Sequence, residues 1–249
     1  DVERGRLGHG GFGSVFEVET DGRRLAVKVA DLRQRPGSWV DPGLHTKRWK
    51  VAIKEVAMMR RVVGHAHVVQ LVEKYLEGGL YYIVMEKCDL TLMHALASMP
   101  EVTEAQLKRC FADMLQGIAA VHAAGIVHRD VKPDNFLVAG GVVKLCDFGT
   151  AVLVKPVGGG GGEDCDGALH GLVGTPPFMP PEMVGGKHYD SKIDAWSFGV
   201  IAYTLFFGSL PYMPAKPTLE AMRGAILSGE PGPSYRGKAD YGLPTAEAV

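Results

Sequence analysis

Apolar and polar residues at the start of the chain follow a pattern that predicts β-strands. Residues 14–19 alternate with a period of two, and an apolar segment resumes at 25–29. Between the two segments, Asp21 and Gly22 form a pair that favours a tight hairpin turn. The first part of the chain is therefore expected to contain an antiparallel hairpin.

One helix and two further strands are expected before residue 90. Apolar side chains recur at helical spacing from about His45 to Val62, which predicts a helix. The apolar segments Val68–Tyr75 and Leu80–Glu86 are expected to be strands. The polar stretch before the helix is interpreted as a loop because it contains Pro36, Gly37, Pro42 and Gly43.

The pattern becomes helical after residue 90. Apolar side chains lie along one face of residues 104–122 and predict an amphipathic helix, and the apolar run 196–207 predicts a buried one. Short apolar segments at 136–138 and 142–145 flank two glycines and predict a second hairpin. A strand-rich part followed by a helical part is an α+β arrangement, in which we expect a cleft between the two parts.

Composition narrows the class of protein. The 249 residues carry 27 Lys and Arg against 28 Asp and Glu, so the basic surplus of a nucleic-acid binder is missing and no nucleic-acid partner is expected. The longest apolar run is shorter than the about 20 residues that span a bilayer, so no membrane segment is expected. Four cysteines without a CxxC pair suit a reducing interior, which predicts an intracellular, cytoplasmic location.

Two further features concern loops and the ends of the chain. The 33 glycines are nearly twice the usual share of about 7%. Five of them are consecutive, at 158–162, and predict a flexible loop. The chain has no initiator Met, and we interpret it as a domain excised from a longer protein.

A glycine-rich motif precedes the first predicted hairpin. Gly8, Gly10 and Gly13 fit G-x-G-x-x-G, and Gly11 lies between the last two. In a dinucleotide-binding fold this motif opens a helix, whereas here a predicted strand follows it. We therefore interpret it as a flap whose backbone can lie close to phosphate oxygens, with an ordinary glycine-rich hairpin as the alternative.

Two lysines are candidates for a phosphate contact beneath this flap. Lys28 lies on the strand after the hairpin, where its ammonium group would reach the phosphates. Lys54 ends the string Val-Ala-Ile-Lys, but it falls in the segment with helical spacing. We therefore choose Lys28, and Glu55 is the candidate carboxylate to pair with it.

The densest group of chemical side chains is the stretch His-Arg-Asp-Val-Lys-Pro-Asp-Asn at 128–135. In this loop Asp130 can orient a hydroxyl nucleophile and Lys132 can neutralise phosphoryl charge. Asn135 offers an oxygen ligand to Mg²⁺. Asp147, in the string Asp-Phe-Gly, follows the second predicted hairpin and can return to the same cleft as a second Mg²⁺ ligand.

The order of these motifs resembles the eukaryotic protein kinase family, and later strings at 174–176, 180–182 and 194–199 extend the resemblance over nearly the whole chain. The string at 128–135, together with Thr175, is similar to the serine/threonine branch. The resemblance implies a bilobal fold with a small β-rich N-lobe holding one helix at 1–87. A hinge and a larger helical C-lobe would occupy 88–249, with the late C-terminal helices missing.

The resemblance also implies an activity. The chain would be a serine/threonine protein kinase that uses ATP and Mg²⁺ and transfers the γ-phosphate to Ser or Thr hydroxyls of protein substrates. Asp130 would be the catalytic base, assisted by Lys132, Thr175 and the Lys28–Glu55 pair, and Asn135 and Asp147 would be the metal ligands. The residues that would hold the nucleotide are Gly8, Gly10, Gly11, Gly13, Val15, Ala26, Lys28, Met85, Glu86, Cys88, Leu137 and Asp147.

One departure from the family concerns loop phosphorylation. In this family Arg129 would pair with a phosphorylated loop residue, yet the segment from Asp147 to Glu182 has only Thr150 and Thr175 as hydroxyl side chains. Both threonines are at positions that look structural. Either this loop needs no phosphate, or acidic residues supply the charge, namely Glu163, Asp164 or Asp166.

Three other questions stay open at this point. Glu182 would lack its usual arginine partner unless Arg223 or Arg236 substitutes for it. The insert at 31–47 either docks a regulatory partner or is a surface loop. The alternative to an active kinase is a catalytically impaired, kinase-like scaffold that binds nucleotide and partners.

Overall fold

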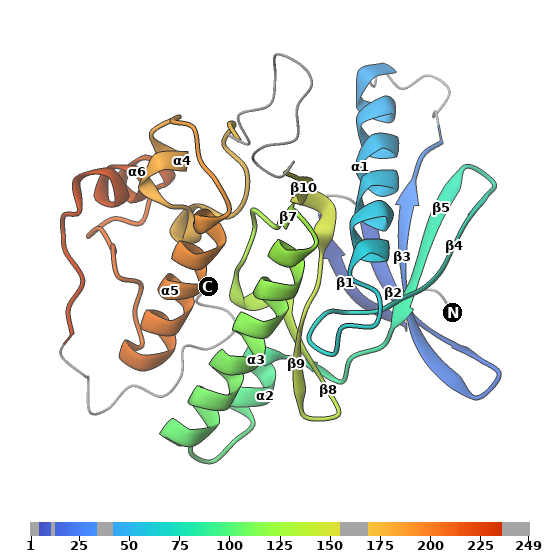
Figure 1. Ribbon diagram of the computed structural model, residues 1–249, viewed down its shortest axis with the longest axis horizontal. Helices are drawn as coiled ribbons and strands as arrows, with labels where there is room; N and C mark the ends of the chain where they lie inside the picture. Colours follow the sequence, from blue (N-terminus) through green and yellow to red (C-terminus); the bar gives the residue numbers. More distant parts are fainter. Residues whose placement is uncertain (1–4, 11–12, 34–41, 155–168, 236–249) are drawn as a thin grey trace.

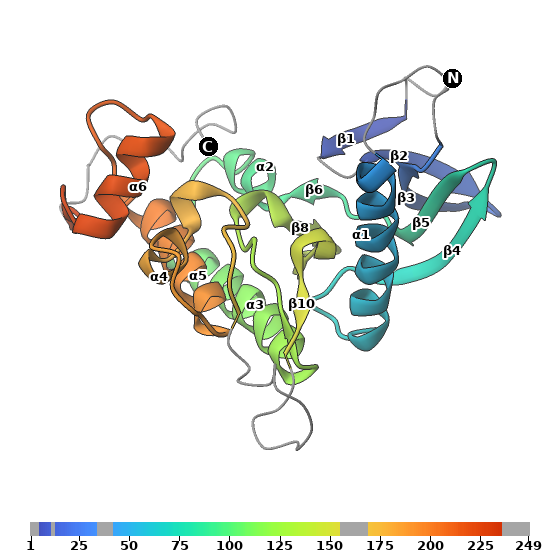
Figure 2. The same ribbon diagram turned by 90° about the horizontal axis from the view of Figure 1, so that it is seen from above.

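A mainly β N-terminal lobe and a mainly helical C-terminal lobe lie side by side in a computed structural model of the chain (Figures 1 and 2). The expected α+β class is confirmed. The structure describes residues 5–10, 13–33, 42–154 and 169–235. The glycine tract at 158–162 and residues 34–41 of the insert at 31–47 therefore lie outside the described residues.

The N-terminal lobe is built on a five-stranded antiparallel sheet in the order β1-β2-β3-β5-β4. Its strands are β1 (Arg6–Gly10), β2 (Gly13–Thr20), β3 (Arg23–Asp31), β4 (Leu71–Glu77) and β5 (Leu80–Glu86). The pairing of β2 with β3 around Asp21 and Gly22 confirms the predicted first hairpin. Since β3 is in the middle of the sheet, its residues 25–28 are buried.

The helix of this lobe is α1 (Pro42–Arg61), which packs against the sheet (Figure 2). It begins three residues before the predicted start at His45, so Pro42 and Gly43 belong to the helix rather than to the loop. Proline is tolerated in the first turn because its missing N–H would have no partner there. The buried side chains described on α1 repeat at helical spacing and are Ala52, Glu55, Val56, Met58 and Met59.

The predicted strand at 68–75 is displaced, because β4 begins only at Leu71. The backbone before it is bonded to the other lobe: Val69 N donates to the Leu145 carbonyl at 3.0 Å, and Leu145 N donates to the His67 carbonyl at 2.9 Å. Gly117 faces the same carbonyl, since a Cβ at that position would lie 2.7 Å from the His67 oxygen. Val68 and Val69 are therefore buried by an interlobe contact and not by the sheet.

The C-terminal lobe holds α2 (Leu92–Ala97), α3 (Glu104–Ala123), α4 (Pro181–Val184), α5 (Lys192–Phe207) and α6 (Leu219–Ser228). The predicted helices at 104–122 and 196–207 are confirmed as α3 and α5. A capping box between Thr103 and Gln106 starts α3 by satisfying two of its free backbone N–H groups. The other three helices are short, and hydrophobic periodicity did not predict them.

Short strands carry the loops that face the other lobe. A three-stranded sheet has the order β6-β8-β9, made of β6 (Leu90–Thr91), β8 (Phe136–Ala139) and β9 (Val142–Leu145). The β8–β9 pair confirms the second predicted hairpin. Strand β7 (Ile126–Val127) pairs with β10 (Val152–Leu153). The loop at 128–135 thus joins β7 to β8, and Asp147 follows β9 directly.

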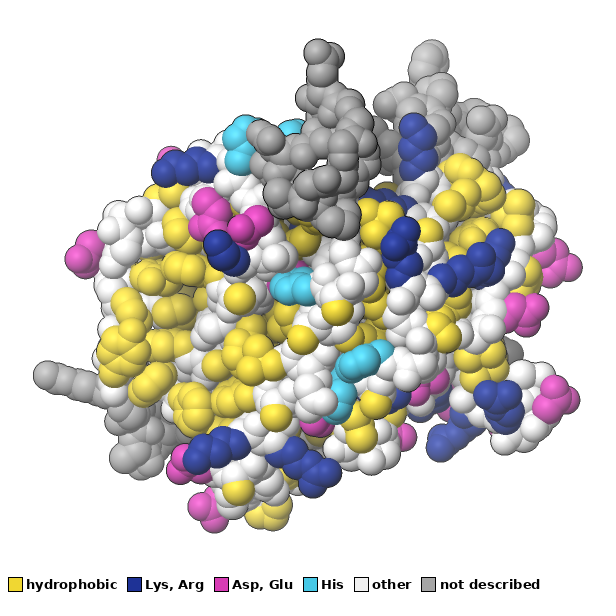
Figure 3. Space-filling model, viewed as in Figure 1, with side chains coloured by type: hydrophobic (Ala, Val, Ile, Leu, Met, Phe, Trp, Pro, Cys, Tyr) yellow, Lys and Arg dark blue, Asp and Glu magenta, His cyan; other side chains and the backbone are white. Residues whose placement is uncertain are grey.

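Apolar side chains remain on the surface of the helical lobe. On the face shown in Figure 3 they gather over the part of the molecule that holds α5 and α6. In these helices Phe206, Leu219 and Leu227 are exposed. Within the described ranges, none of the helices is both long and apolar enough to cross a bilayer.

Candidate active site

A cavity of about 430 Å³ opens between the two lobes. It is lined by residues of the N-terminal sheet, of the connection after β5, and of the loops around β8 and β9. Ten of the twelve residues proposed for the nucleotide line it: Gly8, Gly13, Val15, Ala26, Lys28, Met85, Glu86, Cys88, Leu137 and Asp147. Gly10 ends β1, and Gly11 lies outside the described residues.

A cluster of three charged side chains closes the inner end of this cavity. Lys28 Nζ lies 2.7 Å from one Glu55 carboxylate oxygen, 3.0 Å from the other, and 2.8 Å from Asp147 Oδ1. Lys28 and Glu55 are 8% and 3% exposed. Burial opposes the charge on Lys28, but the two carboxylates outweigh it and raise the pKa of this ammonium group.

The strand position of Lys28 explains why it and not Lys54 makes this contact. Lys28 belongs to β3, and Glu55 lies on the face of α1 that packs against the sheet. Lys54, one residue earlier on α1, has the pKa of its ammonium group lowered by burial and by Arg129. An electrostatic environment of this kind disfavours a charged lysine, whereas that of Lys28 favours one.

Two predicted residues in the loop between β7 and β8, Asp130 and Lys132, are in mutual contact with the predicted Thr175. The Thr175 hydroxyl donates to Asp130 Oδ1 at 2.8 Å, and Lys132 Nζ donates to the Thr175 hydroxyl at 3.0 Å. Lys132 Nζ also lies 3.2 Å from Asp130 Oδ2. Both charged side chains are mostly shielded from solvent, with 12% of the Asp130 and 24% of the Lys132 side chain exposed. A carboxylate held in this way is ready to accept a proton from a hydroxyl group placed beside it.

The two predicted metal ligands offer oxygen atoms suited to Mg²⁺. Asn135 is buried, and its amide nitrogen donates to the Asp130 carbonyl at 2.8 Å, which directs the amide oxygen away from this bond. Asp147 Oδ1 accepts from Lys28, and its side chain is 42% exposed. Burial raises the pKa of Asp147, but Lys28 outweighs it, so the carboxylate pKa is lowered and the group stays ionised. One amide and one carboxylate oxygen fit a cation that takes most of its other ligands from phosphates and water.

Asp194 at the start of α5 fixes the backbone of this loop. Its carboxylate accepts the backbone N–H groups of His128 and Arg129, both at 2.9 Å, and lies 2.8 Å from His122 Nε2. Arg129 has a φ of +68°, a left-handed conformation that is costly for a residue with a Cβ. The two bonds to a 1%-exposed carboxylate hold this strained backbone in place.

Sequence reasoning missed one ion pair at the edge of the cavity, where Glu86 but not its partner lines the wall. Lys144 on β9 places its Nζ 2.9 and 3.0 Å from the two carboxylate oxygens of Glu86 at the end of β5. Glu86 Oε1 also accepts the backbone N–H of Gln70 at 2.8 Å. Alternation along β9 would have shown that Lys144 faces away from the buried Val143 and Leu145, but it would not have named the partner.

The structure tests one of the two arginines that were proposed as partners of Glu182. In the described part of the chain no ion pair joins Glu182 to Arg223, whose buried Nε has no hydrogen-bond partner. Arg236, the other candidate, lies outside the described residues, as do Glu163, Asp164 and Asp166.

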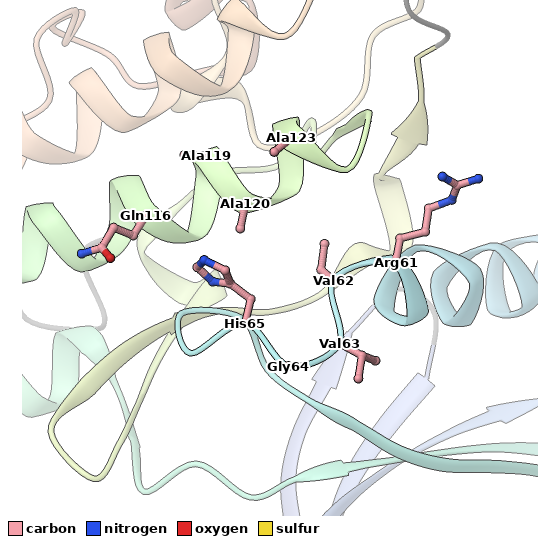
Figure 4. Close-up of a pocket in the computed structure, with 9 residues that line it drawn as sticks. All are labelled: Arg61, Val62, Val63, Gly64, His65, Gln116, Ala119, Ala120 and Ala123. Carbon is pink, nitrogen blue, oxygen red and sulfur yellow. The ribbon is translucent and has the colours of Figure 1, made fainter.

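A second hollow, of about 590 Å³, is lined by other residues (Figure 4). It is bounded by the turn after α1 and by one face of α3, and its lining includes Arg61, His65 and three alanines of α3. None of the residues proposed for catalysis, nucleotide or metal lines it. The interlobe cavity is therefore the candidate active site.

Comparison with known proteins agrees with this geometry. The family model described as "Protein kinase domain" matches residues 2–228. CBL-interacting protein kinase 4 from Oryza sativa subsp. japonica is 37% identical over 84% of this chain and 45% of its own length. Serine/threonine-protein kinase H1 from Homo sapiens is 32% identical over 92% of this chain and 52% of its own length. Serine/threonine-protein kinase STE20 from Yarrowia lipolytica is 29% identical over 91% of this chain and 18% of its own length.

The chain thus spans about half the length, or less, of the curated relatives it matches. The match nevertheless includes both lobes and every motif that lines the cavity. The relatives named above are protein kinases. The chain belongs to the eukaryotic protein kinase family, and its named relatives are of the serine/threonine kind.

Proposed function

We propose that this domain is a catalytically active serine/threonine protein kinase that transfers the γ-phosphate of ATP to a Ser or Thr hydroxyl of a protein substrate. The observation that carries the proposal is the completeness of the site. The contacts that join Lys28 to Glu55 and Asp147, and Asp130 to Lys132 and Thr175, are all formed. An impaired scaffold would be expected to lack at least one of these groups.

The nucleotide would lie in the interlobe cavity with its phosphates toward Lys28. Val15 and Ala26 from the sheet and Leu137 from β8 line the cavity and would enclose the adenine ring. The hinge residues Glu86 and Cys88 would offer backbone groups to its edge. Lys28, with its raised pKa, stays positively charged and would hold the α- and β-phosphates.

Phosphoryl transfer would depend on the loop between β7 and β8. Asp130 would orient the substrate hydroxyl and accept its proton as the oxygen attacks the γ-phosphorus and the bond to ADP breaks. Lys132 would stabilise the negative charge on the transferred group, and Thr175 would hold the Asp130 carboxylate in place. Mg²⁺, bound through Asn135 and Asp147, would supply positive charge to the phosphate oxygens.

Replacement of Asp130 tests the proposal. Asp130→Asn should lower phosphate transfer to a degenerate Ser/Thr peptide library by about 10²–10⁴-fold, the usual cost of losing a general base. Nucleotide binding, measured by calorimetry with ATP and Mg²⁺, should be unchanged because Asp130 does not line the nucleotide cavity. Asp21→Asn in the exposed β2–β3 turn is the matched control, since asparagine also tolerates the positive φ of that position.

Three results would contradict the proposal. Equal transfer by wild type and Asp130→Asn would exclude Asp130 as the base. Nucleotide binding without transfer by the wild-type protein would favour the impaired scaffold. Transfer to small alcohols in preference to peptides would indicate a small-molecule phosphotransferase.

A further inference from the structure

Tyr189, which has no role in the site described above, holds the segment that precedes α4 against the loop between β7 and β8 (residues 128–135, the catalytic loop of the proposed kinase). Tyr189 lies between α4 and α5 and is 5% exposed. Its hydroxyl is within hydrogen-bond distance of two carbonyl oxygens of that segment, His170 at 3.1 Å and Gly171 at 2.9 Å. The same oxygen accepts a hydrogen bond of 3.4 Å from Arg129 Nη1.

Other contacts tie the same two segments together. Leu169 and Tyr189 exchange both of their backbone hydrogen bonds, at 2.8 and 2.9 Å. The rings of His170 and His188 meet edge to face at 5.3 Å. Tyr189 therefore joins Arg129 and residues 169–171 through one buried hydroxyl group.

The Arg129 side chain makes a second hydrogen bond, to the start of the segment that runs from Asp147 to Glu182. Its Nε donates to the Thr150 carbonyl at 2.8 Å, immediately after the Asp-Phe-Gly string. The guanidinium group thus bonds directly to the start of the segment at Thr150, and Tyr189 links it to the carbonyl groups of residues 170 and 171. Gly174 packs directly on this arginine, since a Cβ there would lie 2.5 Å from the Arg129 carbonyl oxygen.

The hydroxyl side chains of the segment are already engaged. From Asp147 to Glu182 the sequence contains no Ser or Tyr and only two threonines. The Thr150 hydroxyl donates to the His128 carbonyl at 3.0 Å, and the Thr175 hydroxyl donates to Asp130 at 2.8 Å. A phosphate on either threonine would break a contact that holds the catalytic loop.

We propose that Tyr189 is a positioning residue that replaces a loop phosphate, so that the segment from 169 to 175 and Arg129 take their catalytic arrangement without phosphorylation. The phenol oxygen accepts from Arg129 as a phosphate oxygen would. Its O–H group donates to the carbonyl oxygens of residues 170 and 171, whereas a phosphate dianion has no proton to donate. The proposal rests on the proposed kinase activity for its kinetic consequence, but its structural consequence is independent of activity.

The structural arm of the test uses hydrogen exchange. Tyr189→Phe keeps the ring and removes the hydroxyl, so the protein should fold while the amides of residues 169–175 exchange about tenfold faster, the effect of losing one or two hydrogen bonds. Tyr75→Phe is the control, because its ring stacks on Tyr82 at an exposed site that does not line the cavity. Unchanged exchange in Tyr189→Phe, with its thermal midpoint unchanged, would overturn the proposal.

The kinetic arm separates this proposal from the proposed function. Wild-type protein treated with phosphatase, and shown by mass spectrometry to carry no phosphate, should keep its transfer rate. Tyr189→Phe should lower kcat about tenfold and leave the KM for ATP unchanged, because Tyr189 does not touch the nucleotide cavity. Loss of wild-type transfer on phosphatase treatment would overturn the role of Tyr189. Absence of transfer before treatment would instead refute the proposed kinase activity, and the exchange result would still decide the role of Tyr189.

Discussion

The buried pair of Lys28 and Glu55 makes a quantitative prediction about stability. Glu55→Gln removes the negative charge and keeps the shape of the side chain. Lys28 would then be left 8% exposed, with only Asp147 as a carboxylate partner at 2.8 Å. A buried cation that loses part of its compensation destabilises the folded state, because the ammonium group is fully hydrated in the unfolded chain.

The magnitude follows from these contacts. Breaking a buried ion pair costs about 3–5 kcal/mol when the remaining charge has no partner. Because Asp147 remains in contact and glutamine still offers one acceptor, we expect a loss of about 2–3 kcal/mol. For a domain of this size, that loss corresponds to a Tm lower by about 4–12 °C.

The measurement is thermal and urea unfolding of the Glu55→Gln variant, compared with the Glu104→Gln variant as a control. Glu104 pairs with Lys108 at 2.7 Å, but both side chains are 70% exposed, so its replacement should leave the Tm unchanged. A lysine whose pKa is raised by folding stabilises the folded state fully at any pH below its unfolded-state pKa. This stabilisation is lost only as the pH rises through the higher pKa of the folded state. The difference between Glu55→Gln and wild type should therefore be equal at pH 7 and pH 9. If the two glutamine variants lose the same stability, the electrostatic reasoning is wrong.

Two further predictions concern a glycine and a cysteine. Gly117→Ala should destabilise the fold by about 1–3 kcal/mol, because its Cβ would lie 2.7 Å from the His67 carbonyl oxygen. Gly224→Ala on α6, where a Cβ meets nothing within 4 Å, should instead stabilise by about 0.5–1 kcal/mol, so equal changes in urea midpoint would contradict the contact. Burial and then the nearby Glu86 raise the pKa of Cys88 to about 12 from its usual value of 9.0. Its alkylation by iodoacetamide at pH 8, followed by mass spectrometry, should be about a thousandfold slower than that of an unperturbed thiol, and a rate like that of glutathione would refute this.

The periodicity of apolar residues along the chain predicted much of the fold. The alternation at 14–19 and the helical spacing of 45–62 were enough to assign Lys28 to a strand and Lys54 to a helix. That assignment selected the lysine that contacts Glu55 in the structure. Local patterns suffice here because each of these elements buries one continuous face.

Contacts between distant segments were beyond such patterns. The partner of Glu86 on β9 is 58 residues away, and the phenol that meets Arg129 is 60 residues away. The positive φ of Arg129 also has no local signal, since it is imposed by Asp194 from α5. Val68 reads as a strand residue because it is apolar, yet its burial comes from the other lobe. The contacts of Glu86 and Val68 depend on how the two lobes meet, and those of Arg129 depend on packing within the C-terminal lobe.

The stretch from His67 to Val69 has a mechanical consequence. It belongs by sequence to the N-terminal lobe, but its backbone is bonded to β9 and rests on Gly117 of α3. If the sheet turns relative to the helices, this stretch stays with the helices and becomes the pivot. A rotation of the sheet would therefore change the width of the interlobe cavity while the backbone hydrogen bonds of residues 67–69 stay intact.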